Sequence, residues 1–377
     1  WAFDESDLQA EQGWLFGRLD NGMRYAIRRN NRPEGTALVR MEVAAGRLDE
    51  RDNERGLAHY VEHMAFNGST NVPEGEMIKL LERLGLAFGA DTNASTAFDY
   101  TQYMLDLPRN DPELLDTALM LMRETASELL FDPEAVERER GVMLAERRDR
   151  TTFQLLNAAD QIDFMFPGSR FAERFPVADR EDLATADAAT LKGYWARNYV
   201  PAKTTLVVVG DFDPLMVEAK IRARFESWRA APVEPQPDAG PHDPDYRGAT
   251  DIHIDPALDE SVTVFRNGPW QDEPDTVTNR ETSLLRAIAN GVVNRRLQRL
   301  TLSENPPFRS AGFSTGDVFE TARQTALTVN TVEGKWQVGT EAALLEYRRA
   351  LTYGFSEAEI AEQVARVRTG LENAVAA

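Results

Sequence analysis

The chain has 377 residues, of which 42 are Lys or Arg and 62 are Asp or Glu, so its formal net charge is −20. Such an acidic chain argues against nucleic acid as a partner, because polyphosphates are bound by positive surfaces. Cysteine is absent, which excludes disulfides, thiolate zinc sites and cysteine nucleophiles. No apolar run approaches the roughly 18 residues of a membrane span, and the length allows two domains.

Strands and helices are expected to alternate over the first 230 residues. Asn21-Gly22 is a strong signal for a hairpin turn between strands at 15–19 and 23–29. Residues 37–45 alternate apolar and polar side chains, as a half-buried strand does. The other expected elements are strands at 98–107 and 204–210, and helices at 57–66, 73–84, 111–130, 133–150, 185–198 and 214–228.

Residues 231–248 contain five prolines and no helical or strand period, which predicts a linker. The predicted domains are therefore 1–230 and 249–377. Because the last helix reaches Ala377 with no closing strand, the second domain is expected to be incomplete or completed by another chain. Its expected elements are strands at 259–266, 309–317 and 322–331, and helices at 277–303, 336–353 and 356–375.

The segment His59-Tyr60-Val61-Glu62-His63 contains two of the four histidines of the chain. On a helix, positions i and i+4 share one face and i+3 lies beside them. Two imidazoles there can hold Zn²⁺, and the glutamate can hold a water for it. We estimate that chance gives such a pair with an inner acid in about half a percent of chains with four histidines.

The alternative is a histidine pair that is only hydrogen-bonded or solvated. The apolar residues around the pair follow a helical period, so the helix should be packed. A packed helix must supply partners for two imidazoles and a carboxylate, and a metal ion is the simplest one. Asn67-Gly68 is expected to end this helix.

A catalytic zinc usually has three protein ligands and one open position. Without cysteine, the third ligand must be Asp, Glu or another His. Glu139 and Glu146 are seven residues apart, and they share one face of a predicted helix with Val142 and Met143. The alternative is a surface helix with ion pairs, given its arginines.

The motif order inverts the H-E-x-x-H of common zinc proteases. With its flanks it resembles the pitrilysin family, which includes insulysin and the mitochondrial processing peptidase, and most strongly the bacterial zinc protease branch. The resemblance implies an α+β fold of two related α/β-sandwich domains, each a mostly antiparallel sheet packed with helices. It covers residues 14 to about 230 strongly and the remainder more loosely. The segments that carry it are 56–69, 93–96, 137–146 and 207–211.

The resemblance also implies roles for individual residues. His59, His63 and Glu146 match the zinc ligands, and Glu62 matches the general base. The other matches are Glu139, as an acid that supports the site without binding metal, and Asn93 and Ala94, where a substrate strand pairs with the edge of the catalytic sheet.

The expected activity is a zinc-dependent endopeptidase that cleaves extended or unfolded peptides, with Zn²⁺ as cofactor. The alternatives are a non-catalytic peptide-binding or assembly subunit of the same family, and a zinc hydrolase of small molecules. The expected partners are a peptide substrate and a second family half, in the same polypeptide or a partner subunit, which closes the chamber and supplies an arginine and tyrosine pair. Neither nucleic acid nor membrane is expected as a partner. The resemblance and the first residue, Trp1 instead of Met, suggest a mature periplasmic protein.

Overall fold

The computed structural model describes residues 1–87, 89, 91–176, 180–240 and 243–376. The chain folds into two compact units. The six-stranded unit is Glu11–Asp238, and the three-stranded unit is Trp1–Ala10 together with Ala239–Ala377. The chain passes from one to the other inside the segment predicted as a linker, whose described residues form no helix or strand. The domain bounds predicted from the sequence stay predictions.

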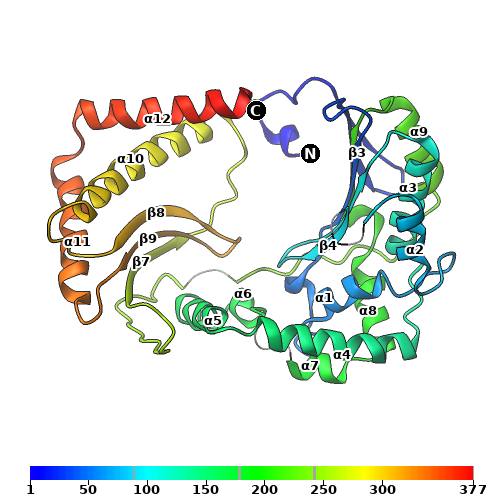
Figure 1. Ribbon diagram of the computed structural model, residues 1–377, viewed down its shortest axis with the longest axis horizontal. Coiled ribbons are helices and arrows are strands. Elements are labelled where there is room, and N and C mark those ends of the chain that lie inside the picture. The colour runs from blue at the N-terminus through cyan, green and yellow to red at the C-terminus, as the bar shows by residue number, and fades with distance from the viewer. Residues whose placement is uncertain (88, 90, 177–179, 241–242, 377) are drawn as a thin grey trace. The chain divides into compact units, whose positions relative to one another are not determined.

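The sheet of the six-stranded unit has the strand order β1-β2-β6-β3-β5-β4. Among the described strands, β2 and β6 pair in parallel, and the other neighbours are antiparallel. Strand β4 forms one edge of this sheet (Figure 1). The bounds are β1 Trp14–Arg18, β2 Arg24–Arg29, β3 Ala37–Val43, β4 Thr92–Thr96, β5 Thr101–Leu107 and β6 Thr204–Gly210.

The predicted hairpin is confirmed, since β1 and β2 are antiparallel neighbours. Gly22 has φ of +96°, a left-handed conformation that glycine adopts without steric cost. The backbone N–H of Gly22 donates to the carbonyl of Leu19 at 2.9 Å and closes the turn. The Asn-Gly pair therefore lies where the chain reverses.

Helices of the six-stranded unit agree with the predicted ones in most places. The short helices α5, α6 and α7 were not predicted. Two of them are too short for a helical period to show in the sequence, and α5 buries no residue fully. The bounds are α1 Leu57–Met64, α2 Glu76–Arg83, α3 Pro112–Ser127, α4 Pro133–Arg150, α5 Phe153–Met165, α6 Arg170–Glu173, α7 Arg180–Thr185, α8 Ala188–Asn198 and α9 Pro214–Phe225.

The six-stranded sheet buries one of its faces. Along β3, Val39 and Met41 are buried, and the side chains between them are more exposed. The same alternation runs along β5 and β6. The buried side chains share one core with Tyr60 of α1, Leu115 of α3 and Ile221 of α9. The strands predicted from alternating apolar and polar residues thus form a sheet whose buried face packs against the helices.

The three-stranded unit has an antiparallel sheet in the order β7-β9-β8. Its core lies between this sheet and two helices, α10 and α11 (Figure 1). The predicted fold class, α+β with mostly antiparallel sheets and helices packed on them, is confirmed. None of the described helices combines the length and apolar character that a bilayer crossing needs. The bounds are β7 Ser261–Pro269, β8 Ser310–Val318, β9 Ala322–Asn330, α10 Val277–Thr301, α11 Trp336–Tyr353 and α12 Glu357–Ala376.

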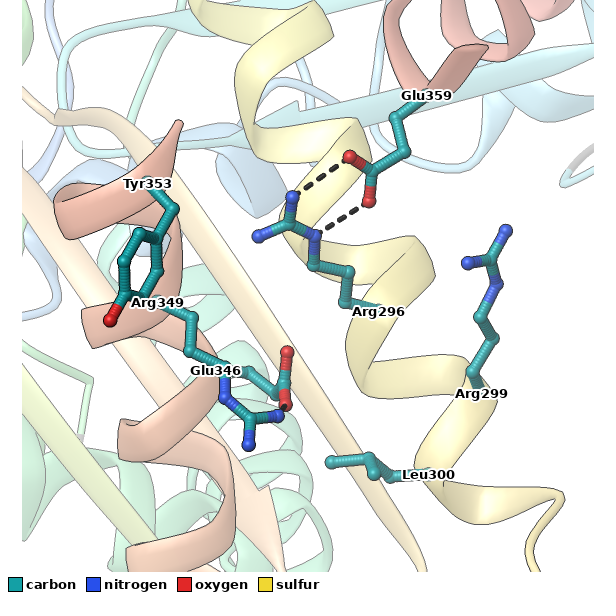
Figure 2. A pocket seen from close by; sticks show the side chains of 7 residues that line it. All are labelled: Arg296, Arg299, Leu300, Glu346, Arg349, Tyr353 and Glu359. Carbon is teal, nitrogen blue, oxygen red and sulfur yellow. Dashed lines mark hydrogen bonds and ion pairs between the residues drawn. The ribbon is translucent and has the colours of Figure 1, made fainter. Parts of the chain in front are cut away.

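A surface pocket of about 480 Å³ lies among α10, α11 and α12 (Figure 2). Arg296 forms a two-point ion pair with Glu359, with nitrogen–oxygen distances of 2.7 and 2.8 Å. Arg349 pairs with Glu346 on the same helix. Because these charges compensate one another within the wall, we read the pocket as part of the packing of the three helices.

A buried ion pair supports the segment that leads into α1. The 3₁₀ turn η2, Arg47–Asp49, ends eight residues before α1 begins. The ammonium group of Lys203 lies 2.9 Å from a carboxylate oxygen of Asp49, and the two side chains are only 7% and 2% exposed. The other oxygen of Asp49 accepts from the backbone of Gly46 at 2.9 Å.

We predict that Lys203→Met destabilises the protein. Breaking a buried pair leaves an uncompensated charge on Asp49, so the free energy of unfolding in urea should fall by about 3 kcal/mol. Lys79→Met is the matched control, because Lys79 is 64% exposed in its 2.8 Å pair with Glu76 and should cost under about 1 kcal/mol. Equal losses in the two variants would contradict the supporting role of the buried pair.

Candidate metal and catalytic site

Helix α1 carries His59, Glu62 and His63 on one side. The imidazole rings of the two histidines lie with centroids 4.7 Å apart and planes at 86°. The apolar residues of the helix are buried, as its period predicted. The helix ends at Met64, a little before the predicted stop, and Gly68 then turns the chain with φ of +106°.

Helix α4 faces α1. Its first turn is capped by Asp132, whose carboxylate accepts from the backbone of two residues in that turn. The hydroxyl of Tyr60 on α1 donates to the carbonyl of Val136 on α4. Met143 is buried, as expected, but Val142 is 50% exposed, so the prediction that both lie on one apolar face is wrong. The buried side of α4 therefore includes Met143 but not Val142, and it is narrower than the positions of these residues between Glu139 and Glu146 suggested.

Glu146 of α4 lies against both imidazoles. Its two carboxylate oxygens are 3.7 Å from Nε2 of His59 and 3.4 Å from Nε2 of His63. One ligand atom from each residue can be chosen so that all three lie within 4.8 Å of one another. Tetrahedral zinc with bonds of about 2.0–2.1 Å separates its ligand atoms by about 3.4 Å. The donor set therefore has the chemistry and nearly the spacing that zinc requires.

Glu139 contacts the opposite nitrogen of His63. Its carboxylate lies 2.7 Å from Nδ1, so Nδ1–H donates to Glu139, and in the neutral ring Nε2 carries the lone pair that a metal ion would bind. The side-chain amide of Asn67 donates to the other oxygen of Glu139 at 3.2 Å and to the carbonyl of His63 at 3.0 Å. The two acids thus occupy different places, one between the imidazoles and one behind a single ring.

Burial and the neighbouring carboxylates shift the pKa values of the two histidines in opposite directions. Burial, with a smaller effect of the neighbouring His63, lowers the pKa of His59 to about 2, so this imidazole is neutral and its lone pair is free. Burial also lowers the pKa of His63, but the hydrogen bond and charge of Glu139 and the charge of Glu146 outweigh it and raise that pKa above its usual value.

Glu62 is a buried carboxylate beside the donor set. Burial raises its pKa, and a hydrogen bond from Thr96 partly opposes this effect. Thr96 Oγ1 lies 2.5 Å from the carboxylate. A carboxylate whose pKa is raised toward neutrality suits a group that takes and returns a proton.

Three polar residues of the site were not predicted in these roles. Asn67 was expected only to end the helix, and Thr96 only as part of a resembling segment. Arg150 lies one turn beyond Glu146 on α4 and pairs with it at 2.7 Å, with its side chain 65% exposed. The i, i+4 spacing from Glu146 was the one signal that could have found Arg150.

Asn93 and Ala94 lie on the edge strand β4. They pair with Met104 and Tyr103 of β5, and no described strand lies on the other side of β4. The side-chain oxygen of Asn93 accepts from the backbone of Ala94 at 2.9 Å. A substrate strand at this edge stays a prediction, for which the edge position is the structural requirement.

Comparison with known proteins identifies two family matches. Residues 25–159 match the insulinase (peptidase family M16) model, and residues 185–367 match the peptidase M16 inactive domain. The first match contains the histidine pair, Glu139 and Glu146. The second includes the whole sheet of the three-stranded unit.

Similar proteins carry protease names. The zinc protease PQQL-like of Arabidopsis thaliana is 32% identical over 78% of this chain and 31% of its own length. The probable zinc protease PqqL of Haemophilus influenzae is 26% identical over 93% of this chain and 38% of its own length. The chain thus spans about a third of the length of these relatives.

The crystal structure of the periplasmic protease PqqL from Escherichia coli superimposes with a TM-score of 0.88 at 26% identity, over 98% of this chain and 41% of that one. The crystal structure of pitrilysin shares the fold, with a TM-score of 0.65. The family models, the similar sequences and the similar structures all point to one family of proteases. It is the family whose resemblance was inferred from the H-x-x-E-H motif. This chain belongs to the insulinase (peptidase M16) family.

Proposed function

We propose that this chain supplies the metal site and general base of a zinc-dependent endopeptidase. The observation that carries the proposal is the carboxylate of Glu146, which lies within 3.7 Å of Nε2 in both His59 and His63. His59, His63 and Glu146 would hold the ion and leave its fourth position open, as in catalytic rather than structural zinc sites. Zinc bound there would supply a water of lowered pKa and a Lewis acid for the scissile carbonyl.

Glu62 would act as the general base. It would take the proton of the attacking water and pass it to the leaving amine, for which its buried position and raised pKa are suited. Glu139 would orient His63 through Nδ1 and is not expected to bind the metal. This division of labour between Glu139 and Glu146 follows from their contacts with different ring nitrogens.

The substrate would bind as an added strand along β4, close to Asn93 and Ala94. An edge strand recognises backbone groups of an extended chain, so unfolded peptides should be preferred over folded proteins. The names of the relatives support peptide cleavage. A non-catalytic role in peptide binding or assembly is less well supported, because the motif residues are intact and meet in space.

The natural setting is also a proposal. The E. coli structure is that of a periplasmic protease, which supports the same compartment here. The relatives are about two and a half times as long as this chain, which supports a second half that closes over the site. That half would supply the arginine and tyrosine pair expected from the family resemblance.

We predict that Glu62→Gln binds zinc but does not cleave peptides. The amide cannot accept the proton of the attacking water, and loss of a general base costs about 10²- to 10⁴-fold in rate. The measurement is cleavage of a quenched fluorescent peptide by the zinc-loaded protein, with zinc content determined in parallel. Full activity in this variant would remove Glu62 from the mechanism.

We predict different effects for the two acids of α4. Glu146→Gln should lose most zinc, because a direct ligand is weakened, whereas Glu139→Gln should weaken binding about 10- to 100-fold through the orientation of His63. Competition with a chelator of known affinity measures both. Glu137→Gln is the matched control, since Glu137 lies on the same helix with 72% of its side chain exposed.

The control should bind zinc as the wild type does. If Glu139→Gln loses zinc more completely than Glu146→Gln, Glu139 is the metal ligand and Glu146 is not. Wild-type protein that binds no zinc would overturn the metal site itself.

A further inference from the structure

Thr96 joins the edge strand to the carboxylate next to the metal site. It is the last residue of β4, and its hydroxyl donates to Oε2 of Glu62 at 2.5 Å. Glu62 is only 8% exposed, so this oxygen has little access to water. The two residues are 34 positions apart in the chain, and the contact forms because α1 packs against β4.

We propose that Thr96 is a positioning residue that holds Glu62 in the orientation needed for proton transfer and links this orientation to the strand that receives the substrate. The inference rests on the proposed function. The hydroxyl holds one carboxylate oxygen, Oε2, and so leaves the other as the proton acceptor.

The chemistry of the contact supports this role. A hydrogen bond to an ionised acceptor is roughly twice as strong as one between neutral groups. Without it, a buried carboxylate oxygen would have no donor, and rotation about the last side-chain bond would be free. Small errors in the placement of a reacting group cost large factors in rate. The hydroxyl of Thr96 therefore limits rotation of the Glu62 carboxylate about its last side-chain bond.

The end of β4 is itself held in place. Thr101 of β5 pairs with Thr96, is fully buried, and donates to the carbonyl of Ala45 at 2.9 Å. The next residue, Ala97, accepts from the backbone of Arg47 at 3.1 Å. These bonds connect the end of the strand to the segment that precedes α1. The position of Thr96 is thus fixed by these backbone and side-chain bonds at the end of β4, and not by its contact with Glu62 alone.

The position of Thr96 links two functions of one strand. Asn93, where we propose that the substrate pairs, is three residues earlier on β4. The hydroxyl of Thr96 contacts the base, whereas the proposed pairing with the peptide backbone is made by the strand edge near Asn93. Orientation of Glu62 should therefore matter for turnover and little for substrate affinity.

The test compares Thr96→Val and Thr96→Ser in the intact, zinc-loaded protein. Val keeps the shape and the β-strand preference but removes the donor, and Ser keeps the donor. With a quenched fluorescent unstructured peptide, Thr96→Val should lower kcat by about 10- to 100-fold, with KM and zinc affinity unchanged. Thr96→Ser should retain most of kcat.

Thr70→Val is the matched control, because the exposed hydroxyl of Thr70 also donates to a glutamate, Glu128, at 3.1 Å, outside the residues assigned to the site, and it should behave as the wild type. Thr96→Ala gives a second removal of the donor if Val perturbs folding, which circular dichroism and urea unfolding detect. If the wild type is active, two results overturn this inference alone. One is an unchanged kcat in Thr96→Val, and the other is an equal loss of kcat in Thr96→Val and Thr96→Ser. A wild type that binds zinc but cleaves no peptide even with the closing half present overturns the proposed function and this inference together.

Discussion

The contact between α1 and α4 is the constraint on which the rest of the site depends. Neither helix carries all three proposed metal ligands, since His59 and His63 lie on one and Glu146 on the other. The hydroxyl of Tyr60 joins the two helices at the carbonyl of Val136, and apolar side chains of both belong to one core. Packing thus brings a carboxylate onto a pair of imidazoles that the helical spacing had already aligned.

The polar cluster in this core is compatible with burial because nearly every group has a partner. His63 is held by Glu139, and Glu139 by Asn67. Glu62 is held by Thr96. Unpaired groups in such surroundings would cost several kcal/mol, so the cluster must form as a whole. The nitrogens that face Glu146 are the ones left for a metal ion.

The sequence predicted those parts of the site that depend on local geometry. His59, Glu62 and His63 were found because a helix places i, i+3 and i+4 together whatever surrounds it. The choice between Glu139 and Glu146 could not follow from spacing alone, since both lie on one side of α4 and only the crossing with α1 separates them. The family resemblance favoured Glu146, which lies against Nε2 of both histidines, whereas Glu139 contacts Nδ1 of His63; the assignment of Glu146 as the metal ligand stays a proposal.

Contacts between distant parts of the chain were beyond the sequence patterns. Asn67 and Glu139 are 72 positions apart, and no local period signals such a bond. In the fold, the hairpin and the strands of alternating polarity were predicted well because one face of the sheet is buried. Helices α5, α6 and α7 were missed, since α6 and α7 are too short to show a helical period and α5 buries no residue fully.

The most direct measurement of the central claim is X-ray absorption at the zinc edge of the intact protein. We predict one bound zinc with three protein nitrogen or oxygen ligands at about 2.0–2.1 Å, two of them imidazoles, and a further light atom in the open position. A spectrum without imidazole scattering, or a protein that retains no zinc after dialysis, would contradict it.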